Sequence, residues 1–325
     1  MKNLSNRCAV LVLLVAATTL AAGTRMKLFP NLQPAQTLTY LIRYQSDKNV
    51  KTESTVAAPM APNAAQLDAH GLLRIEVLDV QPAGTKKILH ARAKFLSLDS
   101  GAWPKQHGDK KPVRDTQRSD HEAKSVEFTI SADGFAEKVQ GLDSLLPEQQ
   151  QAWQEWAARF TLAWTFPADG VKLAEKWKSE QPERAEAPIA GLYWERESAY
   201  VRDEPCRATQ LTVTGEVSAS RAPAESCAVV LTTAKLKQKS SQKDATPEDF
   251  KLHGLRTMGT AKGTNEIITY ISLRTGLIVR ATEEARQFMD VVVATADGSN
   301  RVHYNVDATS HSEVLLVTET LSNQP

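Results

Sequence analysis

Residues 266–283 read EIITYISLRTGLIVRATE, and this stretch decides the fold class of the chain. Glu266–Ser272 and Leu277–Glu283 are rich in β-branched and aromatic residues, which are typical of strands. Arg274-Thr275-Gly276 separates them, and glycine is favoured in tight turns because it has no Cβ atom. The stretch therefore predicts two antiparallel strands joined by a short turn.

Strand patterns continue in both directions from this pair. Upstream, alternate residues from Leu38 to Tyr44 are apolar, which is the period of a strand with one buried face. Downstream, Asp297-Gly298-Ser299 marks a further turn. The C-terminal part thus has five successive strand candidates, which predict an antiparallel meander: Glu266–Ser272, Leu277–Glu283, Met289–Ala296, Arg301–Asp307 and Glu313–Thr318. Earlier candidates are Gln36–Ser46, Leu72–Val80, Ile88–Leu98, Ser125–Ser131, Tyr193–Val201, Ala208–Val217 and Ala228–Lys237.

One segment has helical spacing instead. In residues 147–164 (PEQQQAWQEWAARFTLAW), aromatic side chains recur every three or four positions, and polar ones, Arg159 among them, lie mostly on the other side. Pro147 suits the first turn of such a helix, and a shorter helix is expected to begin at Thr246. We predict a mainly β (β-rich α+β) fold, a curved antiparallel sheet or half-barrel meander with one amphipathic covering helix.

The aromatic stripe of this helix is the candidate binding site. It could line an apolar ligand cavity, rest on a membrane, or simply cover the sheet as part of the core. The charges of the helix sum to about −1, so attraction to anionic lipid is absent and membrane contact is disfavoured. The candidate ligand-binding residues are Trp153, Trp156, Phe160 and Trp164.

The first 23 residues resemble an export signal. Lys2 and Arg7 precede the apolar run Ala9–Leu20, and Ala21-Ala22-Gly23 supplies small residues for cleavage. With Ala21 and Ala22 the run has about 14 residues, which is shorter than the roughly 20 that a membrane-spanning helix needs. We therefore expect a cleaved signal peptide, no transmembrane segment in the mature chain, and a periplasmic or extracellular location.

Cysteine and charge counts sharpen this expectation. Cleavage would remove Cys8 and leave Cys206 and Cys227, and an even pair in an oxidising compartment favours a disulfide over free thiols or a metal site. It would also remove two of the 39 basic residues, leaving 37 against 38 acidic ones, a net charge of −1. That balance argues against nucleic-acid binding.

Sequence signatures of catalysis are missing. The chain has no Gly-x-Ser-x-Gly, His-Glu-x-x-His or phosphate-binding loop motif, so an enzyme is the less expected class and no cofactor is predicted. His303, Asn305 and Asp307 share one strand face, but a solvated face explains the same spacing. The histidines and acids between His107 and Glu122 are interleaved with basic residues, which favours a mixed-charge loop over a metal site. We therefore expect no metal.

The domain organisation is open to two interpretations. After the signal peptide (1–23), an N-terminal β-rich region would span 24–178 with its helix at 147–164. A polar, proline-containing linker at 179–191 would lead to a C-terminal antiparallel meander over 192–325. One continuous domain is the alternative.

Four stretches, taken as a set, resemble an uncharacterised family of exported bacterial proteins that has no assigned activity, so the resemblance implies no catalytic residues. The stretches are EQQQAWQEW (Glu148–Trp156), YVRDEPC (Tyr200–Cys206), KDATPEDFKLH (Lys243–His253) and TYISLRTGLIVRATEEA (Thr269–Ala285).

Shorter patterns are similar to those of periplasmic half-barrel carriers. Phe166-Pro167, Gly170-Val171, Trp177 and the turn within Ser272–Val279 carry this similarity. It implies a curved antiparallel sheet closed by helices over an apolar cavity. The chain departs from the pattern at Ala174-Glu175, where such proteins often have glycine followed by an acidic residue.

Three functions are compatible with these features. The leading hypothesis is an exported, non-enzymatic binding or carrier protein for an apolar or amphipathic small molecule in the cell envelope. A structural or assembly component of the envelope, whose partner would be another envelope protein, is the alternative. An envelope hydrolase comes third, because it would need convergent catalytic side chains.

Overall fold

The computed structural model describes residues 25–55, 64–104, 125–183, 187–211, 217–219 and 223–318. The expected signal peptide and the loop between His107 and Glu122 lie outside these residues. Within them, 13 strands form one sheet, antiparallel except for one short parallel pairing, that of β13 with β8. The predicted mainly β fold with a curved sheet is confirmed.

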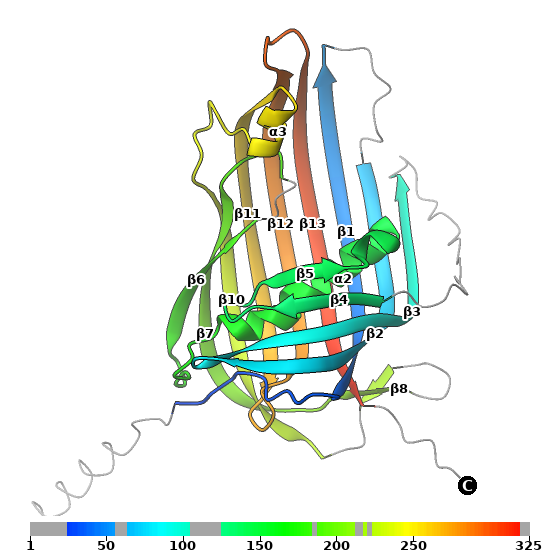
Figure 1. Ribbon diagram of the computed structural model, residues 1–325, viewed down its shortest axis with the longest axis vertical. Helices are drawn as coiled ribbons and strands as arrows, with labels where there is room; N and C mark the ends of the chain where they lie inside the picture. Colours follow the sequence, from blue (N-terminus) through cyan, green and yellow to red (C-terminus); the bar gives the residue numbers. More distant parts are fainter. Residues whose placement is uncertain are drawn as a thin grey trace, which may run out of the picture.

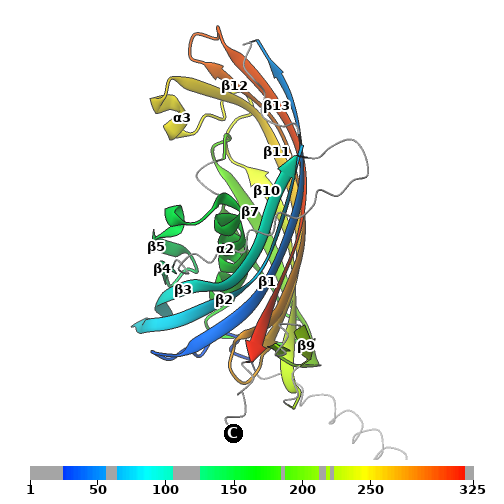
Figure 2. The same cartoon turned by 90° about the vertical axis from the view of Figure 1, so that its right-hand side faces the viewer.

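The strands run in the order β5-β4-β3-β2-β1-β13-β12-β11-β10-β7-β6, with short β8 and β9 off this path. The sheet is strongly curved, and α2 lies on its concave side (Figures 1 and 2). The strands are β1 (Thr37–Ser54), β2 (Ala64–Ala83), β3 (Lys86–Pro104), β4 (Ser125–Ile130), β5 (Ala136–Gln140), β6 (Lys176–Pro182), β7 (Leu192–Cys206), β8 (Thr209–Leu211), β9 (Val217–Ala219), β10 (Glu225–Gln238), β11 (Leu255–Ser272), β12 (Ile278–Thr295) and β13 (Arg301–Thr318).

The C-terminal meander is confirmed, but its division into five strands was wrong. β11, β12 and β13 are 18 residues each, and β12 and β13 each join two of the predicted segments. The charged stretch Glu283–Gln287 breaks the apolar pattern in the sequence, yet it pairs without interruption with both neighbouring strands. The physical reason is that Glu283 is buried and forms an ion pair with Arg159. Because its charge is compensated inside the protein, the strand can continue through this position.

The turn between β11 and β12 matches its sequence pattern. Gly276 has φ 69°, in the left-handed region that favours glycine. A side chain there would also collide with the backbone of Phe29 from the N-terminal segment. Gly276 donates its backbone N–H to Ser272 O at 2.8 Å, and Asn31 donates to Thr275 O at 2.9 Å, so this turn also fixes the N-terminal segment.

The aromatic segment forms α2 (Pro147–Phe160), followed by the 3₁₀ helix η2 (Thr161–Thr165). Proline occupies the first turn as predicted, and the Gln149 side chain accepts a hydrogen bond from the Leu146 N–H at 3.1 Å. The short helix α3 spans Glu248–Leu252, with Pro247 as its N-cap. A second 3₁₀ helix, η1, covers Leu142–Ser144 just before α2.

The sheet wraps around α2. β2 contains bulges at Leu72/Leu73 and Val77/Asp79, which bend the strand and carry its hairpin with β3 across the concave side. β4 and β5 continue the bent part of the sheet, so α2 lies between them and the long strands (Figure 2). The main core therefore has sheet on two sides of one helix.

A second, smaller core lies farther along the concave face. It is built on β7, β10, β11 and β12, and Trp194 of β7 packs closely over Gly263 of β11. A Cβ atom at position 263 would lie 2.9 Å from the indole, which explains the glycine there. Its buried members are Ile189, Leu192, Trp194, Ala234, Leu236, Ala245, Ala261 and Val291.

One sheet contains the strands on both sides of the predicted linker 179–191. β6 runs to Pro182 and pairs with β7, which begins at Leu192. The division of the chain into two β-rich halves or one continuous domain stays a prediction.

The predicted disulfide between Cys206 and Cys227 is confirmed, with Cα atoms 5.8 Å apart. It joins the end of β7 to the start of β10, two neighbouring strands. Both cysteines are buried beside Val279 of β12. The bond closes the loop that contains β8 and β9.

Replacement of both cysteines by serine should lower the free energy of unfolding by about 3 kcal/mol, because the closed loop is 21 residues long. Urea denaturation of the wild type and of the double variant measures the difference. Dithiothreitol should lower the wild-type stability by a similar amount and leave the variant unchanged. An equal effect of dithiothreitol on both proteins would contradict a stabilising disulfide.

Candidate functional site

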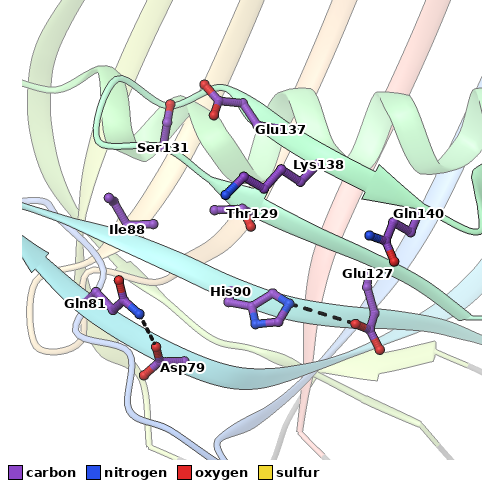
Figure 3. A pocket seen from close by; sticks show the side chains of 10 residues that line it. All are labelled: Asp79, Gln81, Ile88, His90, Glu127, Thr129, Ser131, Glu137, Lys138 and Gln140. Carbon is purple, nitrogen blue, oxygen red and sulfur yellow. Dashed lines mark hydrogen bonds and ion pairs between the residues drawn. The ribbon is translucent and has the colours of Figure 1, made fainter.

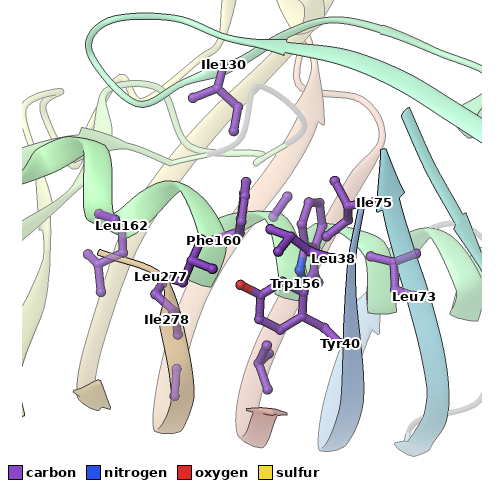
Figure 4. Close-up of a cluster of buried hydrophobic side chains, with 14 of the residues drawn as sticks. Leu38, Tyr40, Leu73, Ile75, Ile130, Trp156, Phe160, Leu162, Leu277 and Ile278 are labelled. Carbon is purple, nitrogen blue, oxygen red and sulfur yellow. The ribbon is translucent and has the colours of Figure 1, made fainter. Parts of the chain in front are cut away.

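The aromatic stripe of α2 lies inside the main core. Trp153, Trp156, Phe160 and Trp164 are each no more than 3% exposed. Trp156 stacks on Phe160 with ring centroids 4.9 Å apart, and Phe128 of β4 packs edge-on against Trp153 and Trp156. Figure 4 shows Trp156 and Phe160 next to Tyr40 of β1. The structure thus brings the four predicted residues together, and whether a ligand contacts them stays a prediction.

Tyr40 Oη, Trp153 Nε1 and Trp156 Nε1 of this core have no hydrogen-bond partner among the described residues. Burial raises the pKa of the Tyr40 phenol, so its proton is retained at neutral pH. Trp164 differs, because its Nε1 donates to Lys87 O at 3.2 Å. Buried donors without an acceptor are costly.

Beside the aromatic stripe, a layer of buried polar side chains separates the two cores. Arg159 of α2 is 4% exposed and forms an ion pair with Glu283 of β12. It also contacts Glu155 at 2.9 Å and Ser312 of β13 at 3.1 Å. Asn265 of β11 donates to Glu283 from the other side. The prediction that Arg159 faces away from the core was wrong, because its guanidinium has a carboxylate partner inside the sheet.

A second buried arginine, Arg196 of β7, belongs to the same layer. It is 5% exposed, and its strand neighbours Trp194 and Ser198 on the same face are also buried. Burial and the nearby charge of Arg159 lower its pKa to about 10, which still leaves the guanidinium charged at neutral pH. No sequence pattern singled out this residue.

Beyond the polar layer, the concave face continues as a row of apolar side chains that we call the apolar wall: Val50, Met289, Val302, Tyr304 and Val306. Val50 of β1 pairs with Val306 of β13, which pairs with Met289 of β12. All five side chains are half-buried. In Figures 1 and 2, α2, β4 and β5 lie over the other part of the concave face, and α3 lies over its far end.

A polar groove of about 410 Å³ lies on the outer face of β2–β5. His90 and Glu127 line it, alternating with buried residues that face α2, and Lys138 and Glu137 come from β5 (Figure 3). Its charges are matched: Glu127 pairs with Arg92 at 2.7 Å and with His90 at 3.9 Å. Polar side chains thus make up the lining of this groove, apart from Ile88.

No group of three His, Cys, Asp or Glu residues in the described ranges could hold a metal ion. His303 contacts Asp290 at 2.6 Å, and Asp307 pairs with Arg286 at 3.0 Å, so both take partners from β12. They belong to the convex face of the sheet, which carries ion pairs between neighbouring strands. Among the described residues, no helix is long and apolar enough to cross a membrane.

Comparisons with known proteins give no family. No protein-family model matches the chain, and no curated protein matches its sequence. A solved structure of a candidate lipoprotein from Parabacteroides distasonis is 8% identical, with 90% of this chain and 98% of that chain covered and a TM-score of 0.27. OpdQ from Pseudomonas aeruginosa is 8% identical over 88% and 100%, with a TM-score of 0.18. Similarity at these scores supports no conclusion about fold or function.

Removing one partner of the buried ion pair should lower the stability of the protein far more than breaking an exposed ion pair. Arg159→Met leaves Glu283 buried without a cation, so the free energy of unfolding should fall by about 3–5 kcal/mol. Arg286→Met is the matched control, because it breaks an exposed ion pair of the same strand, β12, with Asp307 of β13 and should cost less than about 1 kcal/mol. Both differences are measured by urea denaturation.

A double variant, Arg159→Met with Glu283→Leu, should recover most of the loss, since it removes both buried charges. If Arg159→Met costs no more than Arg286→Met, the pair does not hold α2 against the sheet.

Proposed function

We propose that the protein binds and carries an apolar or amphipathic small molecule on the concave face of its sheet, as a non-enzymatic protein of the cell envelope. The observation that supports this most is the apolar wall. It continues the face that forms the core, yet its five side chains are only half-buried. Concave, mostly apolar surfaces with a few polar groups are the usual form of small-molecule sites.

The size of the wall supports binding by apolar contact. One row of paired residues crosses four neighbouring strands without a break. It runs from Val50 of β1 to Val306 of β13 and Met289 of β12, which pairs with Ala261 of β11. Each Å² of apolar surface that a ligand covers contributes roughly 25 cal/mol. An acyl chain or a flat hydrocarbon would cover several of these side chains at once. A ligand of this kind would stabilise a surface that water now contacts.

Export is supported by the disulfide. Structural disulfides persist in oxidising compartments and are rare in the cytosol. The expected signal peptide agrees with this. We therefore place the protein in the periplasm or outside the cell.

A structural or assembly role is the second candidate, and the open sheet is the observation that favours it. β5 and β6 end the sheet and each pairs on one side only among the described strands. However, β6 carries Lys176, Lys178 and Pro182, which discourage the addition of another strand. Cross-linking in cells would recover a protein partner of β5 or β6 if this role held.

Adjacent residues on opposite faces of β12 test the proposal. Met289 belongs to the apolar wall, and Phe288 lies on the convex face and is 37% exposed. Met289→Gln should weaken binding of an apolar fluorescent probe by about tenfold, whereas Phe288→Gln should leave it unchanged. Circular dichroism checks that both variants fold. Equal effects of the two changes would argue against a site on the concave face.

Trp156→Ala separates a packing role from ligand contact in the aromatic stripe. Removal of this fully buried ring should lower the free energy of unfolding by about 3–5 kcal/mol. Native mass spectrometry of protein purified gently from its own compartment should show a bound ligand mass for the wild type. Absence of any such mass, together with unchanged probe binding by Trp156→Ala, would exclude the stripe as part of the site.

A further inference from the structure

One charged side chain lies on the concave face directly beside the apolar wall. Lys48 of β1 is exposed, and Val50 of the wall follows two residues later on the same face. At the described concave positions of β1, β13, β12 and β11 beyond α2, every other residue is uncharged. Lys48 forms no ion pair with any described residue. Its ammonium group is therefore a cation on an otherwise neutral surface.

The sheet register gives Lys48 a neutral hydrogen-bond donor on the other side of one small residue. Lys48 of β1 and Gln287 of β12 both pair with Ala308 of β13, from opposite sides. Neighbouring strands lie roughly 5 Å apart, so the two side chains begin about 10 Å apart and can both extend over Ala308. Because the alanine side chain is a single methyl group, it leaves room between them for a small polar group.

Two hydroxyl groups lie next to this position, on the side toward α2. Ser310 of β13 lies two residues from Ala308 on the same face. It pairs with Ser46 of β1, which lies two residues from Lys48. Both serines and Gln287 are half-buried, so a ligand on the concave face can reach them. None of these three side chains forms a hydrogen bond with another described residue, and their donors are thus available.

The apolar wall and α2 lie on opposite sides of these polar side chains. On one side, Val306 lies two residues from Ala308 and belongs to the wall, which continues to Val302. On the other side, Ser312 is buried and accepts a hydrogen bond from Arg159 of α2 at 3.1 Å. The helix closes that direction. An apolar chain attached to a head group over Ala308 would therefore extend along the wall, where Val306 to Val302 alone span roughly 13 Å.

We propose that Lys48 binds the anionic head group of the ligand, with Gln287 and Ser310 as further donors, so that the protein selects amphipathic anions. This inference rests on the proposed function and specifies its ligand class. Carboxylate and phosphate oxygens accept hydrogen bonds from an ammonium, an amide N–H and a hydroxyl, and the charged donor makes the strongest of these bonds. The shared chemistry is an acyl-chain anion with either a carboxylate or a phosphate head.

The bound chain would strengthen the contact of Lys48 with the head group. An ion pair between exposed groups contributes little by itself, because water screens both charges. An acyl chain on the wall would cover Val50 and Val306 and so exclude water from one side of the ammonium, where charged hydrogen bonds become stronger. The buried Arg159 offers no alternative anchor, because Glu283 and Glu155 already neutralise it.

The test uses dodecanoate, dodecyl phosphate and the uncharged dodecanol as probes. Binding to the full chain is measured by displacement of N-phenylnaphthylamine, an uncharged apolar fluorophore. The wild type should bind at least one of the anions about tenfold more tightly than dodecanol. Lys48→Met should remove that preference and leave the affinity for dodecanol unchanged, and Lys48→Arg should retain it. Preference for one anion over the other identifies the head group.

Lys51→Met is the matched control, because Lys51 is an exposed lysine of the same strand on the convex face. It changes the net charge by the same amount and should keep the preference for anions. Gln287→Leu removes a neutral donor and should lower the ratio of anion to dodecanol affinity by about threefold. Circular dichroism should show that all variants fold, since the three positions are not buried.

The possible failures are distinguishable. If the wild type binds dodecanol and the anions equally, if the preference survives Lys48→Met, or if Lys51→Met removes it as well, the assignment of the head group to Lys48 is wrong while ligand binding stands. If neither the fluorophore nor any of the three probes binds the wild type, the proposed function itself fails.

Discussion

A single curved sheet has a concave face that is apolar over most of its length, and burying that face is the constraint on which the rest of the structure depends. α2 and η2 fill the curve with three tryptophans and a phenylalanine, and β4 and β5 cover the helix from the other side. The helix and the sheet bury each other's apolar side chains, since neither could bury its own alone. The covering stops where α2 stops, which leaves the other part of the face to a smaller core and to the apolar wall.

Charge inside this core sets its orientation. Dispersion and apolar contact are not directional, so an aromatic helix could slide along an apolar face. Arg159 and Glu283 meet in only one arrangement of α2 on β12. A buried pair of this kind contributes more to specificity than to net stability, because both ions lose their hydration. Arg196 lies in the same layer, and its Nε has no hydrogen-bond partner among the described residues.

Local patterns in the sequence predicted much of the fold, and long-range contacts account for what they missed. The strands β2, β3 and β4, the Trp-rich helix and the disulfide follow from the strand pattern, the helical spacing and the cysteine count. The length of β12 did not, because a glutamate in a charged run is typical of a solvated position, and its partner Arg159 lies on α2, far away in the sequence. Arg196 lies in the run Glu195-Arg196-Glu197, which is typical of an exposed strand. Only the burial of Trp194 and Ser198 on either side shows that its face points inward.

The pairing of the first long strand with the last has a kinetic consequence. β1 joins β13 along its whole length, from Thr39 opposite Val317 to Ser54 opposite Val302. This seam lies in the middle of the sheet, so the half made of β1–β5 cannot join the other half until the C-terminal strand has been made. Contacts so distant in the chain form slowly, because the loop between them must close first. A chain that emerges from the ribosome N-terminus first therefore stays incompletely folded through most of its synthesis, which is the state in which a polypeptide can be threaded through a narrow pore.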